Sequence, residues 1–200
     1  MDEHYHSVHG AIQESRHIFI NSGFRFCKAD PVRIFEVGFG TGLNALLTAL
    51  ECCVDKRVVE FTSVEKYPLT QEITQLLNYK VFTGFEGDKL FTLIHSAEWE
   101  SSQEISAYFS IKKIRADLIN AHFEGIYDLV YFDAFRPDKQ PEMWGMDIFA
   151  KISSLMSKNG ILVTYSAKGE VKRNLRANGF EVSFLPGPPG KREIIRAIKM

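Results

Sequence analysis

Short apolar runs alternate with longer amphipathic segments along most of this chain. The apolar runs predict strands at residues 32–38, 58–65, 109–115, 127–132, 160–165, 180–185 and 193–199. Helical spacing of apolar residues falls at 10–23, 42–53, from Pro68 to about residue 78, and at 86–97, 141–157 and 168–178, while 101–106 gives no clear signal. Such alternation is typical of a mostly parallel sheet with helices on its faces.

The last two predicted strands are joined by a short segment rich in proline and glycine, residues 186–192. A connection of this length cannot carry a parallel crossover, so the two strands are expected to form an antiparallel hairpin. A plain dinucleotide-binding sheet would end on a parallel strand. A mostly parallel sheet that ends in a hairpin instead predicts an α/β, Rossmann-like, class I S-adenosylmethionine-dependent methyltransferase fold.

A glycine-rich turn follows the first predicted strand. Gly38, Gly40 and Gly42 alternate, whereas the dinucleotide fingerprint G-x-G-x-x-G would need a glycine where Leu43 stands. Glu36 precedes the turn, and a carboxylate repels phosphate but attracts an ammonium. S-adenosylmethionine carries an α-ammonium, a ribose and an adenine but no phosphate. The turn therefore predicts a site for this cofactor.

Acidic residues end several of the predicted strands, where ligands of open α/β sheets bind. We expect Glu65 to accept the ribose hydroxyls, Asp117 to bind the adenine amino group and Asp133 to lie beside the reactive methyl group. Each can also form a turn or cap a helix. Glu60 lies within its strand, and Asp128 starts its strand at the opposite pole, so both are expected to be structural.

Composition favours one cytoplasmic domain. The 200 residues, 45% of them hydrophobic, are enough for a full core, and we expect a single domain over 1–200, with an N-terminal segment and helix (1–30) packed on the Rossmann-like core (31–200). No signal peptide or membrane-spanning run is visible. Three cysteines without CxxC spacing indicate reduced thiols and no zinc site. His4, His6 and His9 are not expected to hold a metal.

Positive charge is concentrated at the C-terminal end of the chain. From Lys168 onward eight basic residues stand against three acidic ones, a net charge of +5, so the remainder carries −6 within the total of −1. Lys172, Arg173 and Arg176 share one face of a predicted helix. This face is expected either to contact a phosphate backbone or to be an ordinary solvated surface.

Four segments carry a family resemblance along nearly the whole chain. They are Glu36 to Leu43, Val64-Glu65-Lys66-Tyr67-Pro68-Leu69, Asp133-Ala134-Phe135-Arg136-Pro137 with Pro141-Glu142-Met143-Trp144, and Gly190-Lys191-Arg192-Glu193. Together with Tyr5-His6-Ser7, Gly10 and Glu14-Ser15-Arg16, they resemble the methyltransferase domain of the bacterial enzymes that make 5-methylaminomethyluridine at the tRNA wobble position. Ala134 departs from the glycine usual in that family and is expected to narrow the substrate entrance.

The resemblance implies a reaction and its partners. The expected reaction moves a methyl group from S-adenosylmethionine to the amine of 5-aminomethyl-(2-thio)uridine at position 34, in the tRNA anticodon loop. The family's usual flavin-dependent oxidase domain does not occur in these residues, so we expect a stand-alone methyltransferase with a separate oxidase partner that supplies the aminomethyl precursor. Neither DNA nor a membrane is an expected partner.

The expected site residues fall into three sets. Asp133 is the expected catalytic residue, because it can bind the substrate ammonium, accept a proton and align the amine. The expected cofactor-binding residues are Glu36, Gly38, Phe39, Gly40, Gly42, Asn44, Glu65, Lys66, Asp117 and Asp133. The expected substrate- and RNA-binding residues are the aromatic rings of Phe135, Trp144 and Tyr165, which can stack on a base, together with Pro137 and the cations Lys172, Arg173, Arg176, Lys191 and Arg192.

Two other functions remain open from the residues themselves. A small-molecule amine N-methyltransferase, or an aminopropyltransferase similar to polyamine synthases, would also place an acid after the fourth main strand. Such an enzyme would need a more acidic pocket and no basic terminal face. A noncatalytic RNA-binding module would need a vestigial cofactor turn, yet Glu36, Glu65, Asp117 and Asp133 are all present.

Overall fold

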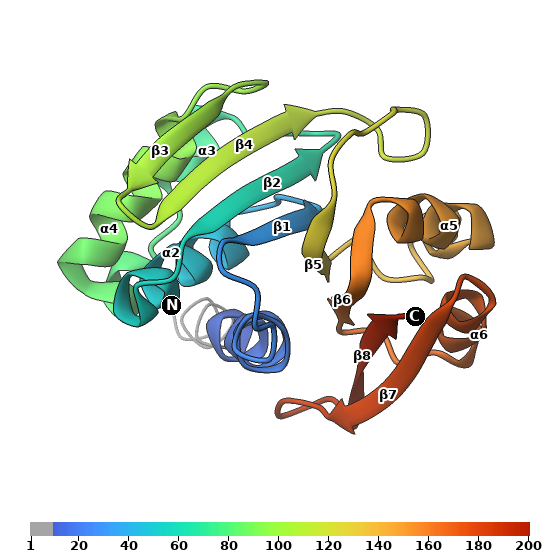
Figure 1. The fold of residues 1–200 in the computed structure, drawn as a ribbon. Helices are drawn as coiled ribbons and strands as arrows, with labels where there is room; N and C mark the ends of the chain where they lie inside the picture. Colours follow the sequence, from blue (N-terminus) through green and yellow to red (C-terminus); the bar gives the residue numbers. More distant parts are fainter. Residues whose placement is uncertain (1–9) are drawn as a thin grey trace.

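Eight strands form one mixed sheet in the computed structural model, which describes residues 10–200 (Figure 1). Their order is β3-β4-β2-β1-β5-β6-β8-β7. The strands are β1 (Val32–Val37), β2 (Val59–Glu65), β3 (Ser102–Ser106), β4 (Phe109–Arg115), β5 (Tyr127–Phe132), β6 (Met156–Thr164), β7 (Phe180–Pro186) and β8 (Glu193–Lys199).

The five central strands are parallel, and the edges of the sheet are antiparallel. β4, β2, β1, β5 and β6 run in one direction, while β3 reverses beside β4, and β8 reverses beside β6 and pairs with β7. The predicted parallel sheet with a terminal hairpin is confirmed. From β1 the chain continues to β2 on one side and returns through β5 on the other, which makes the β1/β5 boundary a topological switch point where ligands bind.

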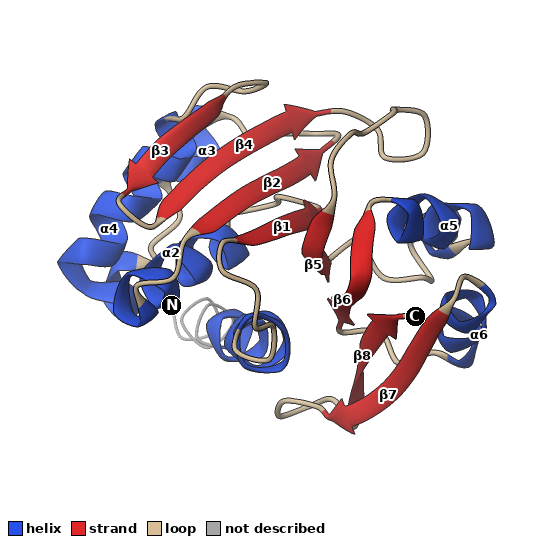
Figure 2. Ribbon diagram, viewed as in Figure 1, coloured by secondary structure: helices blue, strands red, loops and turns tan. Residues whose placement is uncertain are grey.

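Helices cover both faces of the sheet (Figure 2). Residues 10–15 are α-helical and continue into the π-helix η1 (Arg16–Phe24). The other helices are α2 (Leu43–Asp55), α3 (Gln71–Gln75), α4 (Lys80–Ser96), the 3₁₀ helix η2 (Pro141–Trp144), α5 (Met146–Ser154) and α6 (Gly169–Ala177). Neighbouring strand residues point to opposite faces, so Ile34 joins the core with η1, α2 and α4, and Phe35 joins the core with η2, α5 and α6.

The helix predicted from Pro68 is shorter than expected, and the next one is longer. Thr70 is extended, so α3 contains only five residues, of which Thr74 alone is buried. A helix this short with so little buried surface gains little from packing. α4 begins at Lys80 rather than 86, and Gly84 (φ 69°) kinks it, which interrupts the apolar spacing on which the prediction depended.

The helix predicted over 141–157 was also wrong in its extent. Gly145 is extended (ψ 166°) and divides the segment into η2 and α5. β6 begins at Met156, four residues before the predicted start, and its register against β5 shifts between Tyr127 and Leu129. Residues 102–106, which gave no clear signal, form the edge strand β3 because they pair with β4.

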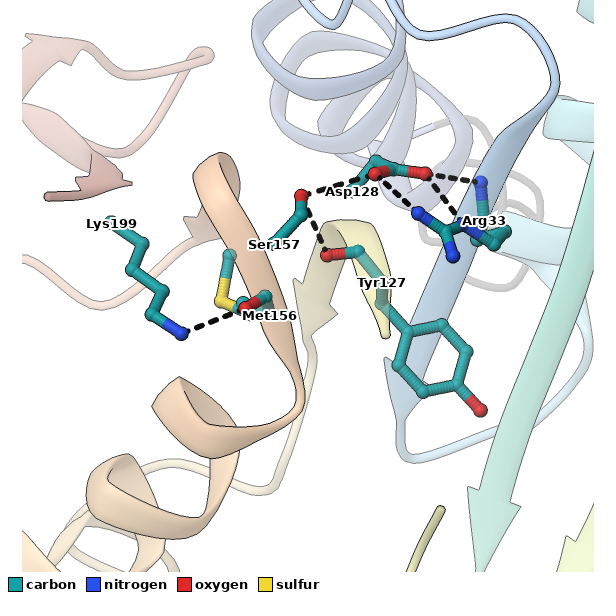
Figure 3. A network of polar contacts seen from close by, with 6 residues as sticks. All are labelled: Arg33, Tyr127, Asp128, Met156, Ser157 and Lys199. Carbon is teal, nitrogen blue, oxygen red and sulfur yellow. Dashed lines mark hydrogen bonds and ion pairs between the residues drawn. The ribbon is translucent and has the colours of Figure 1, made fainter. Parts of the chain in front are cut away.

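A polar cluster joins the amino ends of three strands (Figure 3). Asp128 accepts hydrogen bonds from the Arg33 backbone N (3.2 Å) and side chain (both 3.0 Å) and from Ser157 Oγ (3.0 Å). Lys199 Nζ donates to Met156 O at 2.7 Å in the same region. Burial raises the pKa of Asp128, but the bonds from Arg33 and Ser157 outweigh it, so the pKa lies below its ordinary value. The structural role predicted for Asp128 is confirmed.

The described residues contain neither a cluster of metal-binding side chains nor a membrane-spanning helix. Across residues 10–200 no group of three or more His, Cys, Asp or Glu side chains could hold a metal ion. His4, His6 and His9 lie outside the described residues, as does the Tyr5-His6-Ser7 segment. Cys27, Cys52 and Cys53 are free thiols. No helix within 10–200 combines the length and apolarity needed to cross a bilayer.

Asp128→Asn is expected to lower the free energy of unfolding by about 1–3 kcal/mol, because it weakens the charge-assisted bonds from Arg33. Since the folded pKa of Asp128 is depressed, its contribution is present above the unfolded value of about 3.9 and is lost as pH falls through the folded pKa. Urea unfolding at several pH values measures the loss in the free energy of unfolding and its dependence on pH. Asp138→Asn is the control, because Asp138 forms an exposed ion pair with Lys168 and its substitution should change the free energy of unfolding little. Equal losses of free energy of unfolding in both variants would contradict the prediction.

Candidate active site

The glycine turn brings the ends of β1 and β5 together. Gly38 has φ 90°, and a Cβ added there would lie 2.9 Å from Asp133 O, too close for any other residue. Backbone bonds from Gly38 N to Val64 O (2.9 Å) and from Asp133 N to Val37 O (3.0 Å) hold the three strand ends in place. The predicted turn therefore lies directly beside the predicted catalytic acid.

A cavity of about 850 Å³ opens in front of this turn. It lies at the carboxyl ends of the central strands, the edge at which open α/β sheets bind ligands, and its volume suits a nucleoside-sized molecule. Its walls include eight of the residues predicted to bind the cofactor or catalyse, namely Gly38, Phe39, Gly40, Asn44, Glu65, Lys66, Asp117 and Asp133, together with Phe135 and Tyr165.

Two strand-end acids line the cavity as predicted. Glu65 accepts from Gly40 N (3.1 Å) and Tyr67 N (2.8 Å), so it fixes the glycine turn. Asp117 pairs with Lys66 (2.9 Å) and accepts from Ile119 N (3.0 Å). The bond from Lys66 lowers the pKa of Asp117, which keeps its carboxyl ionised. Both acids thus shape their loops and also line the cavity.

The cavity fits the predicted cofactor in shape and chemistry. Gly40 has a positive φ (51°), and a Cβ there would meet open space, so the backbone can approach a ligand. Glu65 and Asp117 supply hydrogen-bond acceptors of the kind that ribose hydroxyls and an adenine amino group need. Gly42, also predicted to bind the cofactor, does not line the cavity; it precedes α2 in the left-handed conformation (φ 73°), and a Cβ there would lie 2.9 Å from both the Phe39 ring and His95 Nε2.

Asp133 is half-buried and faces the cavity at the end of β5. Its Oδ2 accepts a hydrogen bond from Asn44 Nδ2 at 2.9 Å. Burial raises the pKa of Asp133 to about 7; the bond from Asn44 opposes this shift, the charge of Glu14 adds to it and that of Lys191 reduces it. A carboxyl that titrates near neutrality inside a ligand cavity is suited to proton transfer.

Glu36 does not line the cavity, which corrects its predicted role. The side chain is fully buried, and Oε2 accepts from Ser63 Oγ at 2.6 Å. Burial raises the pKa of Glu36 to about 8. The sequence correctly places Glu36 just before the turn. It does not show which face of β1 the side chain takes, because side chains alternate between the two faces of a strand, and in the structure Glu36 points into the protein interior. A direct ion pair with a ligand ammonium is therefore not the geometry observed.

The mouth of the cavity is aromatic and basic. The Phe135 side chain is 74% exposed, and Tyr165 donates its hydroxyl to Ala134 O at 2.7 Å. Lys191 Nζ lies 4.1 Å above the Tyr165 ring and 2.5 Å from Glu14 Oε1. A smaller cavity of about 280 Å³ adjoins the mouth, lined by Arg136, Pro137, Asp138, Tyr165, Ser166, Ala167, Lys168, Lys191, Arg192 and Glu193.

Trp144 is not the stacking surface that was predicted. It is 2% exposed and packs in the core against Phe132 (ring centroids 4.9 Å apart). Its Nε1 donates to Phe135 O at 2.8 Å. The indole therefore holds the loop that presents Phe135, because a ring this large gains more from burial than from exposure.

The basic helix lies outside both cavities. Arg173 and Arg176 are exposed on α6, and Lys172 Nζ lies 4.8 Å from the centre of the Phe184 ring on β7. Neither the cavity at the glycine turn nor the smaller one includes any of the three. If these three residues contact RNA as predicted, they would contact a part of the RNA that lies outside the cavity at the glycine turn.

The sequence analysis missed the roles of two charged residues that border the cavities. The sequence analysis used Glu14 only as part of the family resemblance. A helical pattern cannot show that the Glu14 carboxylate pairs with Lys191, 177 positions away in the chain. Lys113, within β4, is 1% exposed and donates to Ile94 O (2.9 Å) and His95 O (3.0 Å) at the end of α4. Burial lowers the pKa of Lys113 to about 8. It borders another cavity of about 880 Å³, which shares Phe39 and Gly40 with the cavity at the glycine turn but does not include Glu65, Asp117 or Asp133.

Comparisons with known proteins agree with this geometry. The sequence is 30% identical over 207 residues to the tRNA 5-methylaminomethyl-2-thiouridine biosynthesis bifunctional protein MnmC of Pseudomonas syringae pv. syringae, covering 96% of this chain and 31% of that protein. MnmC of Campylobacter hominis is 32% identical over 201 residues, covering 96% of this chain and 29% of the relative. The chain thus spans less than a third of the length of these curated relatives.

Solved structures show the same fold. MNMC2 from Aquifex aeolicus superimposes with a TM-score of 0.71 at 26% identity, covering 94% of this chain and 60% of that one. TrmN from Thermus thermophilus (TM-score 0.55, 14% identity, 88% of this chain and 47% of that one) shares the fold alone. A family model described as S-adenosyl-L-methionine-dependent methyltransferase matches residues 89–200, more than half of the chain. The predicted resemblance is confirmed, and this chain belongs to the family of S-adenosyl-L-methionine-dependent methyltransferases.

Proposed function

We propose that this protein methylates the amine of 5-aminomethyl-(2-thio)uridine at wobble position 34 of tRNA, with S-adenosylmethionine as the methyl donor. The observation that carries the proposal is the position of Asp133, a carboxyl with a pKa of about 7 between the cofactor cavity and an exposed aromatic mouth. The names of the MnmC relatives support the substrate. A separate oxidase would supply the aminomethyl precursor, and the reaction would take place in the cytoplasm.

Asp133 has two tasks in this reaction. A primary alkyl amine is protonated at neutral pH, with a pKa of about 10, and an ammonium has no lone pair. The ionised carboxylate binds the ammonium and accepts its proton as the nitrogen attacks. Bound S-adenosylmethionine supplies the electrophilic methyl group on a sulfonium. Because Asp133 Oδ2 is held by Asn44 at 2.9 Å, the carboxylate keeps the amine in one orientation, which supplies proximity as well as proton transfer.

The mouth of the cavity suits a base presented by RNA. Phe135 offers an exposed ring on which an unstacked base can lie, and Tyr165, whose hydroxyl bonds Ala134 O, lines the same cavity. Lys191 and Arg192 surround the adjoining cavity, where the phosphates next to a flipped nucleotide would lie. Lys172, Arg173 and Arg176 on α6 would contact phosphates farther along the tRNA.

The charge around the mouth argues against the other two functions. Four cations and two acids border the smaller cavity, and this excess of positive charge favours a substrate that carries phosphates over a free polyamine or a small cationic amine. A noncatalytic RNA-binding module would have no use for a carboxyl held at a pKa near 7 beside an intact glycine turn. RNA methylation uses both the basic mouth and the acid.

Asp133→Asn is expected to retain affinity for S-adenosylmethionine while kcat falls by about 10²–10⁴-fold, because the amide cannot accept the ammonium proton. Calorimetry with the cofactor measures the first quantity. Mass spectrometry of nucleosides from tRNA bearing the 5-aminomethyl group measures the second. Asp138→Asn, five residues further along the chain and exposed, is the matched control and should be active. Near-normal methylation by Asp133→Asn would refute the catalytic role, and no added methyl with the unmodified enzyme would refute the proposed function.

The rate should also depend on pH through Asp133. Burial raises the pKa of this carboxyl to about 7, so it is protonated at lower pH and becomes able to bind the ammonium as pH rises. We therefore expect kcat, at saturating cofactor and tRNA, to increase with pH through a midpoint near this value. Rapid-quench assays from pH 5.5 to 9 test it, and a profile that stays flat down to pH 5.5 would contradict the assignment.

Phe135→Ala is expected to weaken tRNA binding by about 5- to 150-fold, equivalent to the 1–3 kcal/mol of one base–aromatic stack. Affinity for S-adenosylmethionine should not change, because the exposed ring is assigned to the base. Filter binding at constant salt measures the tRNA affinity. Phe85→Ala is a matched control, since Phe85 is 73% exposed on α4 and borders neither the active-site cavity nor the smaller one. Equal losses in both variants would contradict base stacking on Phe135.

A further inference from the structure

An ion pair joins the cavity at the glycine turn to the smaller cavity beside it. Glu14, in the helical residues 10–15, lines the first cavity, and Lys191, in the turn between β7 and β8, lines the second. Lys191 Nζ lies 2.5 Å from Glu14 Oε1 and 4.1 Å from the centre of the Tyr165 ring, which borders both cavities. The Glu14 carboxylate and the Tyr165 ring thus form an ammonium pocket, because carboxylates and aromatic faces both attract a cation.

This ammonium pocket is close to Asp133. Glu14 and Asp133 line the same cavity, and Tyr165 donates its hydroxyl to Ala134 O, next to Asp133 in the chain. The charges of Glu14 and Lys191 both act on Asp133, the first raising its pKa and the second lowering it. Because such effects weaken with distance, both groups lie near the Asp133 carboxyl. A cation in the pocket is therefore attracted by two carboxylates.

The Lys191 side chain ends in the same group that the proposed substrate carries. Lysine and 5-aminomethyluridine each present a primary ammonium on a methylene carbon, so a pocket that holds one can hold the other. The side chains of Lys191 and Glu14 are 30% and 39% exposed. Ion pairs with this much exposure are weak, and the flexible stem of a lysine can turn to another anion. An incoming ammonium can therefore displace Lys191 from Glu14.

Phosphate is the anion that suits the surroundings of Lys191. Arg136, Lys168 and Arg192 border the smaller cavity together with Lys191, and they outnumber the two acids there, Asp138 and Glu193. A tRNA that carries the amine brings a partner for each ion, since its ammonium can pair with Glu14 and its phosphate with Lys191. A tRNA without the amine brings no partner for Glu14.

We propose that Glu14 and the Tyr165 ring bind the substrate ammonium, and that Lys191 is an internal competitor for this pocket that moves to a phosphate when the amine enters. The identity of this ammonium rests on the proposed function. Glu14 holds the ammonium beside Asp133, which accepts the proton. The exchange also makes binding selective, because a base without the amine cannot replace Lys191 at Glu14.

Glu14→Gln is expected to weaken binding of the nucleoside 5-aminomethyluridine by at least about fivefold, because a neutral amide replaces a charged partner of the ammonium. Uridine, which lacks the amine, should bind the variant and the unmodified protein equally. NMR titration with S-adenosylhomocysteine present measures both affinities. Glu181→Gln, an exposed acid on β7 outside both cavities, is the matched control and should bind both nucleosides normally. Equal affinities of the unmodified protein for the two nucleosides, or no loss in Glu14→Gln, would overturn the proposal.

Lys191→Met distinguishes a competitor from a fixed structural ion pair. Methionine keeps an apolar stem beside the Tyr165 ring but cannot compete for Glu14. Affinity for 5-aminomethyluridine, which has no phosphate, should rise by about two- to fivefold, the strength of one exposed ion pair. The two partners of one ion pair thus change the same affinity in opposite directions. An affinity that falls or does not change in Lys191→Met would refute the competition.

The Tyr165 ring is tested in the Lys191→Met background, where its loss acts on the nucleoside ammonium and not on a competing lysine. Tyr165→Leu should weaken 5-aminomethyluridine, relative to uridine, by about two- to fivefold. Tyr165→Phe keeps the aromatic face and removes only the hydroxyl that donates to Ala134 O, so it should recover the affinity. Equal losses in the leucine and phenylalanine variants would exclude the ring from the pocket.

Nucleoside binding and tRNA methylation can fail separately. If the unmodified protein methylates no tRNA amine, but Glu14→Gln and Lys191→Met change the affinity for 5-aminomethyluridine in opposite directions, the proposed function fails and the ammonium pocket stands. If tRNA is methylated and neither variant alters nucleoside binding, the proposed function stands and the ammonium pocket fails.

Discussion

The close contact between the ends of β1 and β5 is the constraint on which the site depends. A side chain at Gly38 would overlap Asp133 O at 2.9 Å, and the Asp133 N–H is already used by Val37 O. The glycine turn and the acid can therefore share one cavity only because the backbone of β1 has no Cβ at this position. This backbone contact places the glycine turn and the acid at the same cavity, whatever the side chains around them do.

The two ends of the sheet use their acids in opposite ways. At the amino end Asp128 is surrounded by donors from Arg33 and Ser157, so it remains ionised and contributes to stability. At the carboxyl end Asp133 receives one bond from Asn44, and the effect of burial outweighs that bond, so its pKa rises toward neutrality. Residues of the same type on one strand thus differ because the number of hydrogen-bond donors around them differs.

Much of the site could be predicted from the sequence, because parallel strands end at one edge of the sheet. That topological rule placed Glu65, Asp117 and Asp133 around a single cavity, where the structure has them. It did not determine where long or buried side chains point. Trp144 is inside rather than at the mouth, Glu36 faces the core rather than the cavity, and Glu14 reaches Lys191 from a helix far away in the chain. The local pattern around these residues is the same for either orientation.

The sequence by itself determined the mostly parallel sheet, the terminal hairpin and the glycine turn. Each depends on local spacing, such as apolar runs of strand length or a connection too short for a crossover. Only the tertiary structure decided the limits of α3 and α4, the pairing of β3, and the titration of Asp133 and Glu36. The reason is physical: helix ends and strand edges depend on packing partners, and a pKa depends on burial and on donors that come from distant parts of the chain.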